Sequence, residues 1–250
     1  MTILATLQTA FDRGQALKII SGLTNFDAES VARTVKAADL GGATFVDIAA
    51  DVNLVKLAKS LTDLPVCVSA VEVEKFLAPV AAGADAIEIG NFDAFYAQGI
   101  RFEAAEVLEL TRQTRALFSD ITLSVTVPHI LALDEQVRLA EALVEAGADI
   151  IQTEGGTSSS PIHAGTHGLI EKAAPTLAAA AEISRAVSVP VLCASGISCV
   201  TAPMAIATGA AGVGVGSAVN RLQSEVEAIA AVRALAESLQ TVSRVRVAAR

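Results

Sequence analysis

Eight short runs of apolar residues alternate along the chain with longer segments of helical periodicity. The runs are Leu17–Leu23, Phe45–Ala50, Pro65–Val71, Ala86–Phe92, Ile121–Val127, Asp149–Glu154, Pro190–Ser195 and Gly212–Gly216. Nearly continuous apolar runs that are separated by helices indicate parallel strands buried on both faces. Eight such units predict an α/β fold, a single (β/α)8 TIM barrel that spans residues 1–250.

The two ends of the chain are predicted to lie outside the eight repeated units. Ile3, Leu7 and Phe11 fall on one helical face, which predicts a short N-terminal helix within residues 1–14. Residues 243–250 follow the last helical pattern and carry three arginines, so we expect a solvated tail there.

An internal repeat relates the two halves of the predicted barrel. The phrase A-G-A-D-x-I occurs at Ala82–Ile87 and again at Ala146–Ile151, and P-V opens the third and the seventh run. The halves differ by an insertion over residues 156–168, after the sixth run. We predict a loop there, at the carboxyl ends of the strands, where barrel active sites form. Long loops of this kind are often functional lids or disordered segments.

Composition excludes several classes of function. The formal net charge is −9 and aromatic residues make up 4%, so neither a basic surface nor a base-stacking platform for nucleic acid is expected. The three cysteines have no C-x-x-C pairing, which favours reduced thiols and argues against a structural zinc site. No signal peptide or membrane span is predicted, and we expect a cytoplasmic protein. An acidic surface and an apolar surplus are compatible with a homo-oligomer.

The last two apolar runs carry the strongest binding signal. Each ends in glycine and serine, and glycine lets a ligand approach the backbone closely. The N–H groups that open a following helix attract anions, and the last two strand-to-helix loops of a barrel frequently bind phosphate. We therefore expect a phosphorylated small molecule to bind there, although these glycines could serve only for turns and close packing. The candidate phosphate-binding residues are Ser195, Gly196, Gly214, Gly216 and Ser217.

Charged residues within the apolar runs are candidates for catalysis, because burying a charge is costly unless it is paired or used. Lys18, Asp47 and Glu88 interrupt the first, second and fourth runs, and Glu154 ends the sixth. A lysine with a lowered pKa can form a Schiff base with a carbonyl substrate, with the carboxylates as acid or base. The alternative is a buried structural ion pair that involves Lys18.

Histidine suits acid–base chemistry near neutral pH. His129 follows the fifth run, and His163 and His167 lie in the insertion, so all three are expected at the carboxyl ends of the strands. We include His129 and His167 among the catalytic candidates, although a loop histidine can be simply solvated. The spacing of His163 and His167 would suit a metal on a helix. The neighbouring Gly165 and Gly168 argue for a loop, and no metal site is predicted.

The chain resembles a known family in the phrases A-L-K-I-I-S-G-L-T-N-F, A-D-A-I-E-I-G-N-F-D-A-F-Y, T-L-S-V-T-V-P-H and I-I-Q-T-E-G-G-T-S-S-S-P. These look like the family called hypothetical chloroplast reading frame twenty-three, conserved proteins of unknown function from cyanobacteria and algal plastids. The resemblance covers nearly the whole chain. It implies a lineage, and a cytoplasmic or plastid-stroma location, but no reaction.

Two more distant resemblances suggest chemistry. The stretch from Pro190 to Ala218 is similar to the phosphate-binding portions of thiazole synthase and of the nitronate monooxygenase group, where the phosphate belongs to FMN. The monooxygenase motif E-A-G-G-H-x-G is matched only at its start, Glu154–Gly156, and at its end, His167–Gly168. Thiazole synthase places its Schiff-base lysine further along the barrel, where this chain has none.

Three functions remain open at this stage. The first is an enzyme that acts on a phosphorylated metabolite by acid–base or Schiff-base chemistry. The second is an FMN-dependent oxidoreductase, which a yellow colour would reveal. The third is a barrel without catalytic activity that senses a metabolite or binds a partner, because a fold alone does not imply catalysis.

Overall fold

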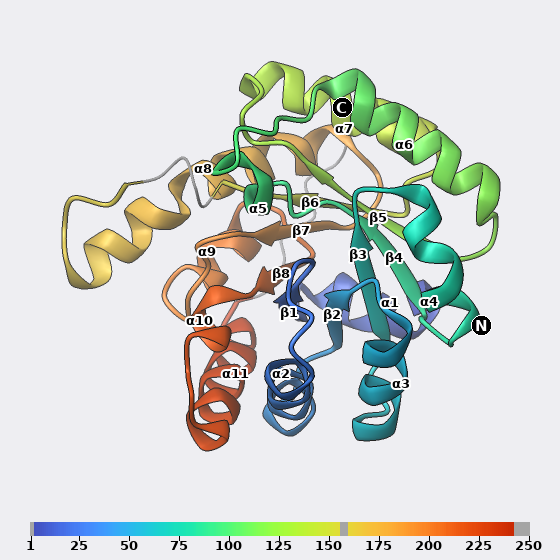
Figure 1. The fold of residues 1–250 in the computed structure, drawn as a ribbon. Coiled ribbons are helices and arrows are strands. Elements are labelled where there is room, and N and C mark those ends of the chain that lie inside the picture. The colour runs from blue at the N-terminus through green and yellow to red at the C-terminus, as the bar shows by residue number, and fades with distance from the viewer. Residues whose placement is uncertain (1–2, 156–159, 243–250) are drawn as a thin grey trace.

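The protein is a closed barrel of eight parallel strands in chain order, as the computed structural model shows for residues 3–155 and 160–242 (Figure 1). The strands are β1 (Ala16–Gly22), β2 (Phe45–Ala49), β3 (Val66–Ala70), β4 (Ala86–Ile89), β5 (Thr122–Val127), β6 (Ile150–Thr153), β7 (Val191–Ala194) and β8 (Gly212–Val215). Each predicted apolar run contains one strand, and β1 pairs with β8 to close the barrel. The predicted (β/α)8 fold is confirmed.

Helices surround the barrel and connect successive strands (Figure 1). They are α1 (Ile3–Arg13), α2 (Ala28–Gly41), α3 (Val52–Leu61), the 3-10 helix η1 (Val73–Phe76), α4 (Leu77–Ala81), α5 (Asp93–Tyr96), α6 (Ala104–Leu117), α7 (Leu133–Glu145), α8 (Gly165–Ala186), α9 (Ala202–Ala207), α10 (Ser217–Asn220) and α11 (Glu225–Leu239). Local sequence sets several ends. Asp27 and Asp51 cap α2 and α3 by accepting hydrogen bonds from backbone N–H groups. Gly42, at φ 87°, ends α2.

Helix α1 closes the amino-terminal end of the barrel. Its buried face, Ile3, Leu7 and Phe11, packs in one cluster with residues from the starts of the strands, among them Ala16 and Phe45. The predicted N-terminal helix is thus confirmed. Because α1 covers this end, the carboxyl ends of the strands form the open end of the barrel.

The insertion after β6 differs from the sequence-based prediction. Helix α8 begins at Gly165, so the first turn of a helix occupies residues that were predicted to be loop. A helix of 22 residues offsets the low intrinsic helix propensity of its early glycines. Residues 156–159 of the insertion and the expected tail, residues 243–250, lie outside the described residues.

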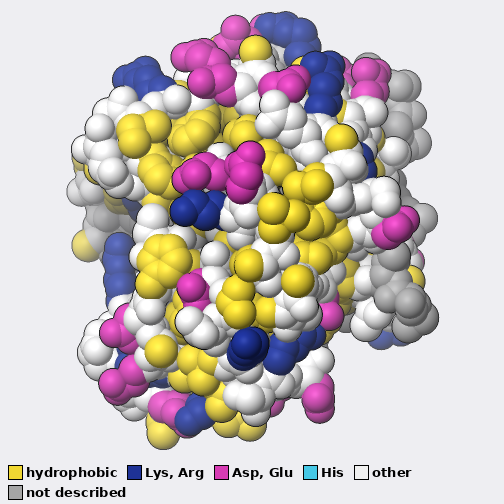
Figure 2. Space-filling view, turned by 45° about the vertical axis from the view of Figure 1, so that its right-hand side comes forward, with side chains coloured by type: hydrophobic (Ala, Val, Ile, Leu, Met, Phe, Trp, Pro, Cys, Tyr) yellow, Lys and Arg dark blue, Asp and Glu magenta, His cyan; other side chains and the backbone are white. Residues whose placement is uncertain are grey.

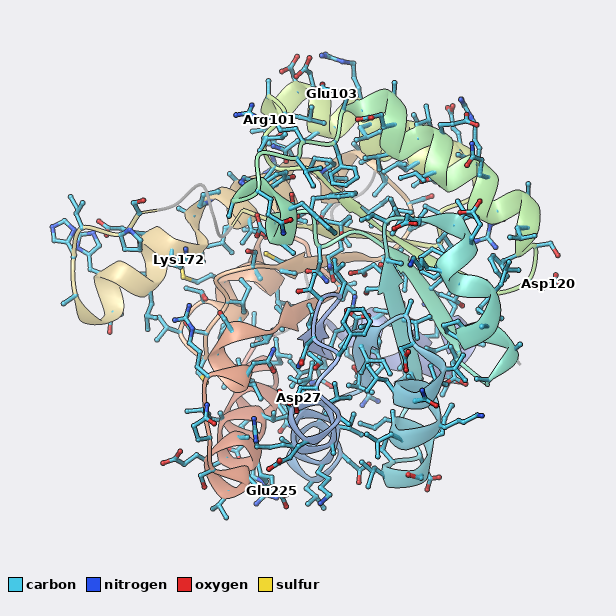
Figure 3. All side chains as sticks on the ribbon, in the orientation of Figure 1. Asp27, Arg101, Glu103, Asp120, Lys172 and Glu225 are labelled. Atoms are coloured by element: carbon cyan, nitrogen blue, oxygen red, sulfur yellow. The ribbon has the colours of Figure 1, made fainter. Side chains whose placement is uncertain are left out.

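Charged side chains lie on the helices and loops around the barrel, as Figure 3 shows for Asp27, Glu103, Asp120 and Glu225. Within the described parts of the chain, none of the helices combines the length and apolar character needed to cross a bilayer.

Candidate functional site

Three of the predicted catalytic residues meet inside the barrel. Lys18 on β1, Asp47 on β2 and Glu88 on β4 have side chains that are 0% exposed. The Lys18 ammonium forms an ion pair with Glu88 Oε2, donates a hydrogen bond of 3.1 Å to Gln152 Oε1, and lies 3.8 Å from Asp47 Oδ2. We call Lys18, Asp47, Glu88 and Gln152 the interior cluster.

The two carboxyl groups of the interior cluster are held differently. Glu88 accepts hydrogen bonds from Ser124 Oγ and Gln152 Nε2, each 2.7 Å long, besides its contact with Lys18. Asp47 accepts one from Ser69, and its other oxygen, Oδ2, has no hydrogen-bond partner. Burial raises the pKa of Asp47 to about 7, although the charge of Lys18 acts to lower it. Glu88 is therefore the direct counter-ion of Lys18.

Lys18 is a poor candidate for Schiff-base chemistry in this position. Burial acts to lower its pKa, but the negative charges of Asp47 and Glu88 outweigh burial and raise the pKa above the ordinary value. A nucleophilic lysine needs a neutral amine and access to substrate, and Lys18 is charged and fully buried. The geometry thus favours the structural ion pair among the two interpretations of Lys18.

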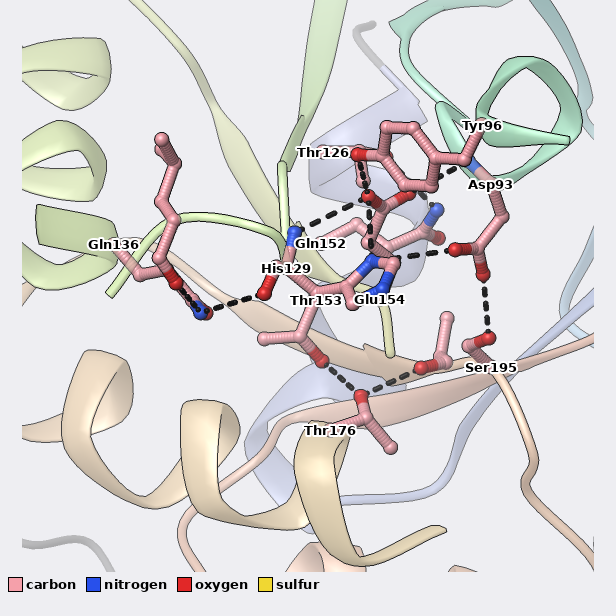
Figure 4. A network of polar contacts seen from close by, with 12 residues as sticks. Asp93, Tyr96, Thr126, His129, Gln136, Gln152, Thr153, Glu154, Thr176 and Ser195 are labelled. Carbon is pink, nitrogen blue, oxygen red and sulfur yellow. Dashed lines mark hydrogen bonds and ion pairs between the residues drawn. The ribbon is translucent and has the colours of Figure 1, made fainter. Parts of the chain in front are cut away.

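A second polar cluster lies at the carboxyl ends of the strands (Figure 4). Its members are Asp93 and Tyr96 on α5, His129 after β5, Glu154 after β6 and Ser195 after β7, which we call the mouth cluster. His129 Nδ1 lies 3.1 Å from Glu154 Oε1 and 3.2 Å from Asp93 Oδ1. Tyr96 donates a hydrogen bond of 2.5 Å to Glu154 Oε1, and Ser195 Oγ donates one of 2.9 Å to Asp93 Oδ2.

The pKa values of Glu154 and His129 are both shifted by their surroundings in the mouth cluster. Burial raises the pKa of Glu154, although His129 and Tyr96 act to lower it. Burial acts to lower the pKa of His129, but the hydrogen bond to Glu154 and the charges of Glu154 and Asp93 raise it overall. The Glu154 carboxyl group and the His129 imidazole are in contact, so a proton can pass between them.

The mouth cluster borders a cavity of about 290 Å³ at the ends of β6, β7 and β8. Asp93 and Glu154 line it on one side, and Lys172 and Arg221 contribute basic side chains. All five predicted phosphate-binding residues line the same cavity: Ser195, Gly196, Gly214, Gly216 and Ser217. Their spacing in the sequence placed them on two separate loops, and the barrel brings these loops together.

The loop after β7 has an unusual backbone. Ser195 and Gly196 both have left-handed conformations, with φ 77° and φ 74°. Left-handed backbone is costly for serine, and such outliers concentrate at functional sites. A Cβ atom at position 196 would lie 2.8 Å from the backbone oxygen of Lys172, so α8 also requires glycine there. This loop is thus shaped to pass beneath α8 and face the cavity.

Two features refine the predicted phosphate site. A helix opens directly after β8 as expected, since α10 begins at Ser217, but it has four residues, and the helix after β7, α9, begins only at Ala202. Gly214 also serves close packing, since a Cβ atom there would lie 2.8 Å from Ala194 Cβ. The cavity thus offers an anion the loop backbone after β7, the short first turn of α10 and two basic side chains, Lys172 and Arg221.

His167 is not part of the mouth cluster in the structure. It lies in the first turn of α8, is 63% exposed, and stacks on the ring of His163 with centroids 4.1 Å apart. Both histidines contact Glu171, with His163 Nδ1 2.6 Å from Glu171 Oε1. His167 therefore neither completes a flavin motif with Glu154 nor reaches the mouth cluster.

Two groups of described residues have the composition and spacing to hold a metal ion: Asp93 with His129 and Glu154, and His163 with His167 and Glu171. His167 lies in α8, whereas His163 precedes the helix, so these two histidines are not spaced one turn apart on a helix.

Sequence reasoning missed Asp93, Tyr96, Gln152 and Arg221. Asp93 and Tyr96 belong to the four-residue α5, which is too short for a periodic signal. One signal was present: polar residues follow the end of β4 directly, in N-F-D-A-F-Y. Residues at the carboxyl ends of barrel strands are the usual place for active-site groups.

The fold and the cavity define the class of this chain, a (β/α)8 barrel with a polar site at the carboxyl ends of its strands. The family model described as "Protein of unknown function (DUF561)" matches residues 3–245, and the chain belongs to this family. The relatives named "Uncharacterized protein ycf23" agree with the resemblance seen in the sequence. The one from Cyanophora paradoxa is 44% identical and covers 85% of this chain and 88% of its own length. The one from Pyropia yezoensis is 41% identical, and the match covers 82% of this chain and 75% of the relative's length.

Solved structures share the fold at low sequence identity. GGGPS from Thermoplasma volcanium has a TM-score of 0.68 at 13% identity and covers 97% of this chain and 99% of its own. The thiamine phosphate pyrophosphorylase from Pyrococcus furiosus has a TM-score of 0.60 at 18% identity and covers 92% and 98%. The (S)-3-O-geranylgeranylglyceryl phosphate synthase from Thermoplasma acidophilum, solved in complex with its substrate sn-glycerol-1-phosphate, has a TM-score of 0.64 at 17% identity, with coverages of 97% and 100%.

Proposed function

We propose that this chain is an enzyme that binds a phosphorylated small molecule in the mouth cavity and transfers a proton on it. The observation that carries the proposal is that one cavity is lined both by groups that suit a phosphate and by groups that can exchange a proton. The loops after β7 and β8 supply backbone, hydroxyl groups and the basic side chain of Arg221, which suit a phosphate. The same cavity is also lined by Asp93 and Glu154, which contact His129, and Ser195 Oγ joins the two sets of residues through its hydrogen bond to Asp93.

The roles within the mouth cluster follow from its contacts. Glu154 is hydrogen-bonded by Tyr96 and lies against His129, so Glu154 and His129 together hold one exchangeable proton. Asp93 faces the cavity with its side chain 23% exposed, whereas those of His129 and Glu154 are 4% exposed. In this proposal Asp93 meets the ligand directly, and His129 relays the proton between Asp93 and Glu154.

The fold relatives support a phosphorylated ligand. The Thermoplasma acidophilum synthase is named with a phosphorylated substrate, sn-glycerol-1-phosphate. Two other relatives by fold, thiamine phosphate pyrophosphorylase and N-(5'-phosphoribosyl)anthranilate isomerase, carry phosphorylated molecules in their names. At identities below 20% the likeness concerns the fold, and the cavity residues of this chain carry the chemical argument.

A charge placed at the cavity rim tests the binding half of the proposal. Ala218 lines the cavity and is exposed, so Ala218→Glu should leave the fold intact. We expect it to weaken binding of sn-glycerol-1-phosphate at least about tenfold, because two anions repel at short range. Ala116→Glu, the same change at an exposed position of α6, should bind as the unaltered protein does. Equal affinities for both variants would refute the site.

Native mass spectrometry of the freshly purified protein, with a visible absorption spectrum of the same sample, tests the ligand class. A colourless protein with a bound phosphorylated metabolite supports the proposal and supplies a substrate for turnover assays. A yellow protein would instead favour the flavin alternative. If the metabolite binds but is not turned over, and Glu154→Gln leaves its affinity unchanged, the barrel is a sensor and not an enzyme.

A further inference from the structure

The mouth cavity continues into two others. A cavity of about 360 Å³ lies over β1 and β8, and it shares six residues with the mouth cavity: Ile20, Asn91, Asp93, Gly216, Ser217 and Arg221. A further cavity of about 550 Å³ lies over β1, β2 and β3, and it shares Leu23 and Thr24 with the second. The three cavities adjoin one another across the open end of the barrel, from β7 to β3, and we call them together the trough.

The two ends of the trough differ in chemistry. The end over β7 and β8 contains the serine hydroxyl groups and basic side chains that suit a phosphate. The end over β1 to β3 has more apolar lining residues than polar ones, and its larger apolar side chains are Leu23, Phe26, Val71, Pro79 and Phe95. Its polar lining residues are Thr24, Asp51, Ser69, Glu72, Glu74 and Lys75. The Asp51 carboxylate is engaged as the cap of α3, where it accepts hydrogen bonds from the backbone of Asn53 and Leu54.

Phe26 is the largest exposed apolar side chain of the trough. It is 62% exposed, although burying a phenylalanine side chain is favourable by about 1.5–3 kcal/mol. Figure 2, which brings the side of α3 and α4 forward, shows hydrophobic side chains gathered between acidic and basic ones across that face. Grouped apolar side chains at the rim of a cavity mark a place that a ligand covers.

We propose that the phosphorylated ligand carries an apolar chain, and that this chain lies over β1 to β3 while the phosphate lies against β7 and β8. This inference rests on the proposed function. Helix α5 links the two ends, because Asp93 lines the first two cavities and Phe95 lines the third. Asp93 of the mouth cluster therefore lies where the polar head of the ligand meets its apolar chain. The ligand class is a single-chain phosphate monoester, taken up as a free molecule.

A series of straight-chain alkyl phosphates tests this directly. Ethyl, butyl, hexyl and octyl phosphate, each below its micelle concentration, are titrated into the full-length protein by calorimetry. We expect the affinity to rise about two- to fourfold per added methylene, the upper value applying to complete burial. Equal affinity for ethyl and octyl phosphate would overturn the inference and leave the phosphate cavity standing. No binding by any member, or by inorganic phosphate, would overturn the proposed function and this inference together.

A surface variant locates the chain in the trough. Phe26→Ser removes an exposed ring and should fold normally. We expect it to weaken octyl phosphate binding about three- to tenfold and to leave ethyl phosphate binding unchanged, because only the longer chain reaches β1 to β3. Val226→Ser, at a 75% exposed position of α11, is the control and should change neither. Loss of both ligands to the same degree, or of neither, in Phe26→Ser would overturn the assignment of the apolar end.

Discussion

The interior cluster and the mouth cluster contain similar groups and differ in what surrounds them. Each combines two carboxyl groups with one basic side chain and at least one hydroxyl neighbour. Lys18, Asp47 and Glu88 lie within their strands and are fully buried, whereas His129 and Glu154 follow strand ends and lie beside a cavity. The interior cluster reaches the mouth cavity through Gln152, which lines that cavity from within β6. For the charged groups, position along the strand therefore separates those that support the fold from those that can meet a ligand.

The largest effect should come from breaking the interior cluster. Lys18→Met leaves Asp47 and Glu88 buried without a cation, and we expect it to lower the free energy of unfolding by about 3–5 kcal/mol. Denaturant unfolding measures this. Lys18→Met combined with Glu88→Gln should recover part of the loss, because the unpaired charge is then removed. If Lys18→Met keeps its stability but abolishes turnover, the lysine belongs to the chemistry after all.

A smaller effect should appear in the pH dependence of stability. Burial raises the pKa of Asp47 from its ordinary value of 3.8 to about 7, so the folded protein holds a proton that the unfolded chain releases. Between about pH 4 and pH 7 this group lowers stability as the pH rises, by on the order of a few kcal/mol in total. Asp47→Asn should flatten that slope when unfolding is measured across this range. A slope identical to that of the unaltered protein would show that Asp47 is ionised throughout.

The mouth cluster should respond to substitution in its titration. Glu154→Gln removes the charge that raises the pKa of His129, so the NMR titration midpoint of this histidine should fall. Glu171→Gln makes the same substitution on α8, away from the cavity, and should leave the His129 midpoint in place. The free energy of unfolding should also change less in Glu154→Gln than in Lys18→Met. A midpoint of His129 that is the same in both variants would contradict the proposed relay.

The smallest effect on stability is expected at Asn91. This residue has φ 64° and lines the first two cavities, and its side-chain nitrogen is buried without a hydrogen-bond partner. Asn91→Gly suits the backbone and should change the free energy of unfolding by no more than about 1 kcal/mol. We expect it to weaken phosphate-ligand binding, because Asn91 lines the mouth cavity and the change removes its side chain. Unfolding and calorimetry on the same sample separate the two effects, and unchanged affinity would remove Asn91 from the site.

The sequence was most informative where burial forces a pattern. Eight apolar runs predicted eight strands, because strands covered on both faces have no polar side. Glu154 and His129 could be placed at the open end because each follows a predicted strand. The contact between Lys18 and Glu88 was harder to predict from the sequence, because it crosses the barrel interior between β1 and β4, which are not neighbouring strands.

Other parts of the site depend on packing that the sequence does not display. Asp93 and Tyr96 reach Glu154 only because α5 folds over the ends of the strands. The loop prediction for Gly165 and Gly168 followed from local propensity, but α8 extends over them. Gln152 was overlooked because an uncharged residue in an apolar strand carries little signal, yet it bonds both Lys18 and Glu88.

Helix α1 keeps water out of the amino-terminal end of the barrel, besides packing against it. The Lys18 ammonium lies 6.0 Å from the centre of the Phe45 ring, and Phe45 belongs to the apolar cluster that α1 covers. A layer of apolar side chains that includes the Phe45 ring thus lies between the buried ions and the helix. Without α1, water would gain a second way into the lumen and would weaken every charge interaction there. Because α1 closes one end of the barrel, a ligand can enter only from the carboxyl ends of the strands. A protein fused to the N-terminus would lie at the opposite end and should not obstruct ligand entry.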